Sequence, residues 1–193
     1  MIQSKHDLYK YLKEDAIALG IRENGLKSKL KQLIVPNHIW KFQKTLRKVE
    51  YYKNCGSTGL KKLLFLYYKI KFRNISIKLG FSIPENVFGP GLAIVHYGTI
   101  VVNNNARIGA NCRIHACTNI GASGGSPKAP QIGDNVYIGP GAKIYGDINI
   151  GNNIAIGANA TVFKSFEEPN IMIAGNPGKK IKEIDIKKII KHI

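Results

Sequence analysis

Two histidines supply the side chains best suited to chemistry in this sequence. Of the five histidines, only His96 and His115 fall within the repetitive middle of the chain. An imidazole titrates near neutral pH, so it can accept or donate a proton during a reaction. A zinc site on the same repeat would require three converging histidines, and the cysteines show no metal-ligand spacing. We therefore expect acid–base chemistry and no bound metal.

A six-residue repeat must position these histidines. Aliphatic residues recur every six positions, glycine follows most of them, and small or aliphatic side chains come four positions after each start. The aliphatic positions are Ile108, Ile114, Ile120, Ile132, Ile138, Ile144, Ile150, Ile156 and Val162. A period of six fits neither an amphipathic helix nor an alternating strand, but it fits a parallel β-helix whose coils each contain three hexapeptides. The aliphatic side chains should point inward, and the glycines and asparagines should adopt turn conformations with positive φ.

Stacking of the coils is expected to bring the two histidines together. We predict one column made of Ile94, Ile114, Ile132 and Ile150. Strands of adjacent coils lie about 4.8 Å apart, so His96 and His115 would be neighbours on one outer face. After Ile120 the repeat fails, and the Gly- and Pro-rich segment 121–130 is predicted to leave the coil as a loop.

Helical segments are expected on both sides of the repeat. Apolar spacing and N-cap residues predict helices at 5–19, 37–52 and 60–72, and a last basic helix at 180–193. We divide the chain into a helical N-terminal region at 1–75, a β-helix domain at 76–178 and a basic C-terminal tail at 179–193. The fold class is mainly β, with a small α-helical part.

The large positive charge lies on the flanks of the repeat. The net charge of +17 divides into +12 for residues 1–75, +1 for 76–178 and +4 for 179–193. No nucleic-acid recognition motif accompanies this charge, so no nucleic acid is expected. Solvated helix faces, an acidic acceptor or an anionic membrane surface would each explain it. Without a signal-peptide core or an apolar run of spanning length, we expect a cytoplasmic protein, with peripheral association at the inner face of the membrane as an option.

At this point the residues resemble a known family. The segment 96–102 (HYGTIVV), the Ile-Gly repeats and the segment 174–179 (AGNPGK) together are similar to the serine acetyltransferase branch of the hexapeptide-repeat acyltransferases. The likeness covers roughly residues 80–182 and is loose in the helical part. It implies a left-handed β-helix, acetyl-CoA as the co-substrate, and a homotrimer with active sites between subunits. Whether trimers pair into hexamers stays open.

The resemblance also implies roles for individual residues. His96 matches the family's catalytic histidine, which would take the proton of the acceptor hydroxyl as its oxygen attacks the thioester. His115 and Tyr97 are candidates for support or for contact with the acceptor, and the loop would offer N–H groups to the oxyanion. The matching coenzyme A positions are Gly121, Ala122, Gly139, Pro140 and Ala158, with Lys164, Lys179 and Lys180 as candidates to meet its phosphates.

Three departures from the family bear on the acceptor. Val95 and Phe81 stand where the family has aspartates, and Ala129 stands opposite its loop histidine. Losing charged partners costs more for a zwitterion than for a neutral sugar, so we favour a carbohydrate hydroxyl, such as that of a surface-polysaccharide precursor. The alternative is the serine acetyltransferase of cysteine biosynthesis, in which the terminal Ile193 would dock into cysteine synthase. An alternative of another class is a non-catalytic trimeric scaffold.

Overall fold

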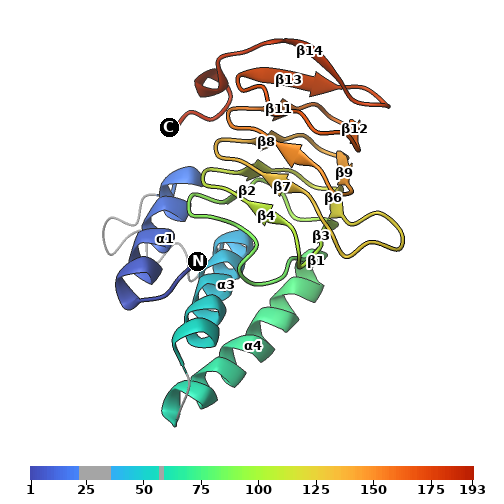
Figure 1. Cartoon of the computed structure of the whole chain (residues 1–193). Coiled ribbons are helices and arrows are strands. Elements are labelled where there is room, and N and C mark those ends of the chain that lie inside the picture. The colour runs from blue at the N-terminus through green and yellow to red at the C-terminus, as the bar shows by residue number, and fades with distance from the viewer. Residues whose placement is uncertain (22–35, 57–58) are drawn as a thin grey trace.

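Helices gather at one end of the part of the molecule that the structure describes (Figure 1). The computed structural model describes residues 1–21, 36–56 and 59–193. Its α-helices are α1 (Lys5–Ala18), α3 (His38–Cys55) and α4 (Leu60–Leu79). The side chains of Ser4 and Asn37 cap α1 and α3 by accepting hydrogen bonds from backbone N–H groups of the first turn. The helix α4 is longer than predicted, because only Gly80, in the left-handed conformation, ends it. No helix among the described residues is long and apolar enough to cross a membrane.

Short strands that step around three sheets form the rest of the molecule (Figure 1). The strands are β1 (Phe81–Ser82), β2 (Ala93–Ile94), β3 (Ile100–Val102), β4 (Arg107–Ile108), β5 (Arg113–Ile114), β6 (Thr118–Gly121), β7 (Gln131–Ile132), β8 (Tyr137–Ile138), β9 (Lys143–Tyr145), β10 (Asn149–Ile150), β11 (Ala155–Ile156), β12 (Thr161–Val162), β13 (Ile171–Ala174) and β14 (Lys179–Glu183). One sheet has the order β1-β3-β6-β9-β12, the second β10-β7-β4 and the third β14-β13-β11-β8-β5-β2. All pairings are parallel except β13 with β14. The predicted parallel β-helix is confirmed.

The stacking column predicted from the sequence is wrong beyond its second member. Ile94 pairs with Ile114, but Ile114 pairs with Ile138. Ile132 and Ile150 pair with each other in a different sheet. Eighteen residues separate Ile132 from Ile150, whereas twenty-four separate Ile114 from Ile138. The prediction counted a constant coil length through the loop at 121–130, which adds six residues to the coil that contains it.

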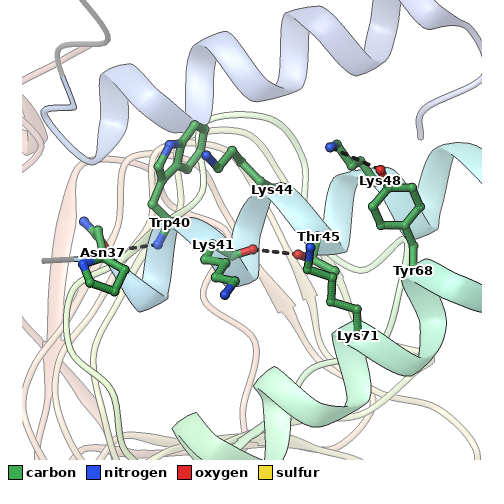
Figure 2. A pocket seen from close by; sticks show the side chains of 9 residues that line it. Asn37, Trp40, Lys41, Lys44, Thr45, Lys48, Tyr68 and Lys71 are labelled. Atoms are coloured by element: carbon green, nitrogen blue, oxygen red, sulfur yellow. Dashed lines mark hydrogen bonds between the residues drawn. The ribbon is translucent and has the colours of Figure 1, made fainter. Parts of the chain in front are cut away.

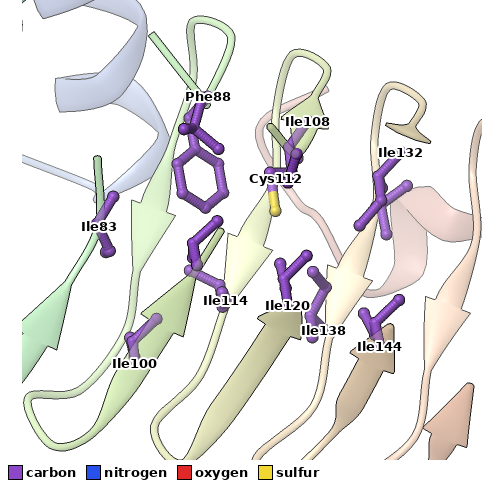
Figure 3. Packing of buried hydrophobic residues seen from close by; sticks show 14 of the residues in the cluster. Ile83, Phe88, Ile100, Ile108, Cys112, Ile114, Ile120, Ile132, Ile138 and Ile144 are labelled. Carbon is purple, nitrogen blue, oxygen red and sulfur yellow. The ribbon is translucent and has the colours of Figure 1, made fainter. Parts of the chain in front are cut away.

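The repeated aliphatic residues form a continuous core inside the coils. Each of the nine predicted inward positions is at most 5% exposed, and the small residues four positions later are buried as well. Figure 3 shows the side chains of successive coils pointing into the same interior. Fully burying one such side chain contributes about 1.5–3 kcal/mol. The inward-facing prediction is therefore confirmed.

Asparagine and glycine occupy the corners of the coils for different physical reasons. Asn111, Asn135 and Asn153 adopt φ near 57–58°, as predicted, and their side-chain amides form a hydrogen-bonded ladder. Gly109, which follows a core isoleucine, is not among the residues with positive φ. A Cβ there would lie 2.7 Å from the carbonyl carbon of Gly133 on the next coil. Close approach of the backbones, rather than positive φ, therefore requires glycine after isoleucine.

A buried ion network fastens α1 and α3 to the first coil. Arg47 is fully buried, and its Nε donates to Asp15 Oδ2 at 2.8 Å while Nη1 donates to Glu50 Oε2 at 3.0 Å. The same guanidinium donates to the carbonyl oxygens of Phe88 and Gly89. Burial alone would lower the pKa of Arg47, but the two carboxylates raise it. The charged network thus links segments that are far apart in the sequence.

The C-terminal segment is not the helix predicted for residues 180–193. It forms β14, antiparallel to β13, and then a short 3-10 helix η1 (Ile186–Lys188). Pairing with β13 satisfies backbone groups that would otherwise be left at the sheet edge. Ile186 and Ile190 are buried against Tyr137 and neighbouring apolar side chains. The apolar residues of this segment therefore cover the outer face of a sheet.

Candidate functional site

His96 and His115 lie side by side on one edge of the β-helix. This histidine edge is where the chain passes from the sheet of β2, β5, β8 and β11 to the sheet of β3, β6, β9 and β12. Because β2 and β5 pair in register, the histidines that follow them reach the same edge. Their ring centroids are 5.8 Å apart, with the ring planes at 53°. The prediction that they are neighbours is confirmed.

The two rings differ in their surroundings. His96 is exposed, whereas His115 is half-buried and packs against Tyr137, with the ring centroids 5.1 Å apart. The Nε2 atom of His115 is buried, and no residue that the structure describes forms a hydrogen bond with it. Burial, and then the charges of Arg113 and His96, lower the pKa of the His115 imidazole. The neutral form of the His115 imidazole is therefore favoured.

No carboxylate orients His96 in the part of the chain that the structure describes. Among these described residues, none forms a hydrogen bond or an ion pair with its ring. Val95, directly before it, is half-buried. Phe81 is 5% exposed and packs edge-on against Phe42 in the core, with ring centroids 4.9 Å apart. The site is thus uncharged at the positions where the resemblance led us to look for acids.

Three of the predicted coenzyme positions lie along the histidine edge. A Cβ on Gly139 would be 2.8 Å from the backbone nitrogen of Ala158, so these residues stack on successive coils. Asn159 N donates to Pro140 O at 2.8 Å. The chain reaches this edge again after β13, where Gly178 N donates to Thr161 O. A strip of small residues therefore continues along this edge beyond His115, in which Pro140 and Ala158 are exposed and Gly139 is buried.

Three further predicted coenzyme positions do not join that strip within one chain. Gly121 ends β6, Ala122 follows it and Lys164 follows β12. All three lie at the edge of the sheet of β3, β6, β9 and β12 that is opposite the histidine edge. The loop predicted for 121–130 leaves the coil from this far edge, but it begins at residue 122 because Gly121 belongs to β6 (Figure 1). The structure therefore separates the predicted positions into two edges.

The other predicted contacts are exposed side chains. Tyr97 is 73% exposed, and no hydrogen bond among the described residues involves its hydroxyl. Lys179 begins β14, next to the turn after β13. Lys180 Nζ lies 2.6 Å from Glu168 Oε1, so its charge already has a partner. Lys179 is the better placed of these two lysines to meet a phosphate.

Three residues of this region were not predicted from the sequence: Arg113 and Tyr137 near His115, and His192 near Arg113. Arg113 and Tyr137 each precede a core isoleucine in equivalent repeats, and their backbones pair directly. The repeat would have revealed them if the length of the loop-bearing coil had been known. His192 lies in the C-terminal segment; burial and then Arg113 lower the pKa of its imidazole. No local sequence signal places His192 near Arg113, because only the path of the chain brings them together.

Comparison of the sequence with known proteins finds one family model and several relatives. The model for bacterial transferase hexapeptide (six repeats) matches residues 129–164. A serine acetyltransferase from Mycobacterium tuberculosis is 38% identical over 100 residues, which cover 51% of this chain and 43% of the relative. One from Staphylococcus xylosus is 35% identical over 114 residues, covering 58% of this chain and 50% of the relative. The matching region thus spans about half the length of these relatives or less.

Solved structures match over nearly the whole chain. A serine acetyltransferase from Brucella abortus superposes with a TM-score of 0.72 at 23% identity, covering 94% of this chain and 72% of that one. The Neisseria gonorrhoeae enzyme gives 0.70 at 26% identity, covering 98% and 72%. The Brucella abortus enzyme in complex with coenzyme A gives 0.70 at 28% identity, covering 94% and 70%. These likenesses confirm the left-handed β-helix and the resemblance to serine acetyltransferases on which the sequence analysis relied.

Proposed function

We propose that this chain is an acetyl-CoA-dependent O-acetyltransferase with His96 as its general base. The observation that carries the proposal is the exposed His96 ring, 5.8 Å from the His115 ring, on a fold shared with serine acetyltransferases. One of those similar structures holds coenzyme A. The strip of small residues beyond His115 provides room for a flat-lying pantetheine arm.

The proposed reaction is a direct transfer between two bound substrates. The acceptor hydroxyl donates a hydrogen bond to His96, and His96 takes the proton as the hydroxyl oxygen attacks the acetyl carbonyl carbon. Backbone N–H groups stabilise the resulting oxyanion. The carbon–sulfur bond then breaks, and the proton on His96 passes to the departing coenzyme A sulfur. A neutral His115 favours this sequence, because a second positive charge beside His96 would oppose its protonation.

For the acceptor, the comparisons favour L-serine over the carbohydrate that the sequence analysis preferred. The sequence relatives and the structural neighbours described above are all serine acetyltransferases, and none of them supports a sugar. One observation keeps a carbohydrate hydroxyl as the second candidate. Val95 and Phe81 provide no carboxylate for the ammonium group of an amino acid, and Phe81 is buried in the core. Serine is the first acceptor to test.

We propose that the active sites lie between the subunits of a homotrimer. The separation of the predicted coenzyme positions into two edges supports this, because the histidine edge of one subunit can face the far edge of its neighbour. The loop from that far edge would then supply oxyanion donors to the neighbouring site. The three cysteines form no disulfide, which suits the reducing cytoplasm, where we place the reaction.

Release of coenzyme A from acetyl-CoA tests the proposal. The assay compares L-serine with a panel of sugars and sugar nucleotides, using the natural chain, His96→Ala and the matched control His6→Ala, which removes an exposed histidine of α1. Loss of a general base should lower kcat about 10²–10⁴-fold, while the control should leave it unchanged. His96-dependent turnover of serine alone supports the first acceptor, and turnover of a sugar alone supports the second. No turnover, together with no binding of acetyl-CoA, would favour the non-catalytic scaffold.

A further inference from the structure

The helix α4 carries two apolar faces, and only one of them packs on the protein. Phe65, Phe72 and Leu79 contact the core. On the opposite side of the helix lies an outward stripe made of Leu63, Leu66, Tyr67, Ile70 and Ile77, whose side chains are 54–70% exposed. These positions recur at spacings of three, four and seven residues, so they lie on one helix face. A long exposed apolar face of this kind marks a surface that binds something.

Basic residues flank the outward stripe on both sides. Helical spacing places Lys71 and Lys78 along one flank and Lys62 and Arg73 along the other. Lys71 Nζ lies 5.7 Å from the ring centroid of Tyr67. The helix contains six basic residues and no acidic one. An apolar face bordered by lysines is the pattern of helices that lie in a bilayer interface.

A lysine-lined pocket continues this surface between α3 and α4 (Figure 2). The pocket has a volume of about 330 Å³, and its lining includes Lys41, Lys44, Lys48, Lys71, Trp40 and Tyr68. Lys41 and Lys71 also line the adjoining hollow that contains Tyr67 and Ile70. Within the described chain, no carboxylate forms an ion pair with Lys41, Lys48 or Lys71. The lysine pocket and the outward stripe therefore form one surface, positive in part and apolar in part.

From this geometry we infer that the lysine pocket and the outward stripe, together called the α3–α4 surface, bind an anionic phospholipid bilayer. The outward stripe enters the interface, and the lysine pocket receives a lipid phosphate. A bilayer supplies both an apolar layer and negative charge, which match the two parts of the surface. A second copy of the chain fits less well. A symmetric contact through the stripe would place the same basic flanks against each other, with no acidic residue on α4 to offset them.

Flotation with lipid vesicles tests the inference on the full chain. One vesicle preparation contains phosphatidylcholine alone and the other phosphatidylcholine with phosphatidylglycerol. Each lysine near an anionic surface should strengthen binding about fivefold. The double variant Lys41→Gln, Lys71→Gln should therefore weaken vesicle binding by more than tenfold. The double variant Leu66→Ser, Ile70→Ser should weaken it by a similar factor, because it removes apolar area from the stripe. The matched controls are Lys182→Gln and Ile181→Ser on β14, where Ile181 is 56% exposed against 54% for Ile70. Circular dichroism confirms that each variant is folded.

The expected result is binding to the anionic vesicles only, weakened by both α3–α4 double variants and by added salt, and unchanged in the β14 controls. Three results would overturn the inference: no vesicle binding, equal binding to both preparations, or equal losses in the control variants. A different result would show that the surface joins copies of the chain. In that case the chain does not bind vesicles, and sedimentation shows an assembly that dissociates in the Leu66→Ser, Ile70→Ser double variant. These readouts do not involve acetyl transfer, so the inference and the proposed function fail independently.

Discussion

At the scale of single residues, His115 and His96 show how similar side chains acquire different properties. His96 lies two residues after the core isoleucine Ile94, and His115 lies one residue after Ile114, the residue that pairs with Ile94. His115 is half-buried against Tyr137 and lies near the positive charge of Arg113, while His96 is open to solvent. An exposed ring can reach a substrate, and a half-buried neutral ring can support it without adding charge.

The lowered pKa of His115 predicts a loss of stability in mild acid. In the unfolded chain the imidazole takes up a proton near its ordinary pKa of 6.5, while in the folded chain it does so only at lower pH. The unfolded state therefore binds more protons below about pH 6.5, and the free energy of unfolding falls there. Denaturant unfolding measures the free energy of unfolding at about pH 7.5 and about pH 5.5. The difference between these two values should be smaller for His115→Gln than for the natural chain. A ring that titrates above 6.5 by NMR would contradict the prediction.

Gly109 allows a second test at this scale. Because a Cβ would press on the backbone of Gly133, Gly109→Ala should lower the free energy of unfolding by about 1–3 kcal/mol. Gly124→Ala is the matched control, since a Cβ there would meet nothing within 4 Å and should change stability by less than about 0.5 kcal/mol. Thermal or denaturant unfolding measures both variants. Equal effects would show that close approach of the coils is not what excludes a side chain.

At the scale of elements, the helices depend on the coils more than on their own sequences. The α3 helix presents Arg47 to a carboxylate on α1 and to backbone carbonyls just before β2. One buried guanidinium therefore fixes two helices relative to the first coil. Removing one partner of a buried ion network leaves the others as uncompensated buried charges.

Arg47→Met should therefore lower the free energy of unfolding by about 3–5 kcal/mol. The methionine keeps much of the volume but leaves Asp15 and Glu50 buried without their cation. The control is Lys10→Met, which removes the surface pair of Lys10 with Glu14 and should cost at most about 1 kcal/mol. Denaturant unfolding gives both values. A small loss in Arg47→Met would mean that the buried ion network contributes little to holding α1.

At the scale of the whole molecule, charge and site residues are concentrated in different places. This distribution indicates one contact between subunits along the β-helix and another contact at the helical end. The central region is nearly neutral, while the flanks carry most of the charge of +17. The predicted coenzyme positions occupy two edges of the β-helix, and the basic surface lies on helices at one end (Figure 1). A trimer that joins the edges would leave the helical end free for other contacts.

The proposed trimer predicts a solution mass near three times the 21.3 kDa of the chain. Light scattering after size-exclusion chromatography measures this mass directly. If the sites lie between subunits, dilution that splits the trimer should lower activity and coenzyme A binding in parallel with the mass. A monomer that binds coenzyme A as tightly as the trimer would contradict the shared site, and twice the trimer mass would indicate a hexamer.

Local spacing along the chain is enough to predict the repeat, the inward-facing aliphatic residues, the loop and the proximity of His96 to His115. All of these depend on local spacing, since a strict period fixes which side chains share a face. The three-dimensional fold was needed to establish the columns beyond the loop, because one insertion of unknown length shifts every later contact. It also decided the contact of Tyr137 with His115, the path of the C-terminal segment and the second apolar face of α4. Each of these depends on what packs against a residue, and no local pattern specifies that neighbour.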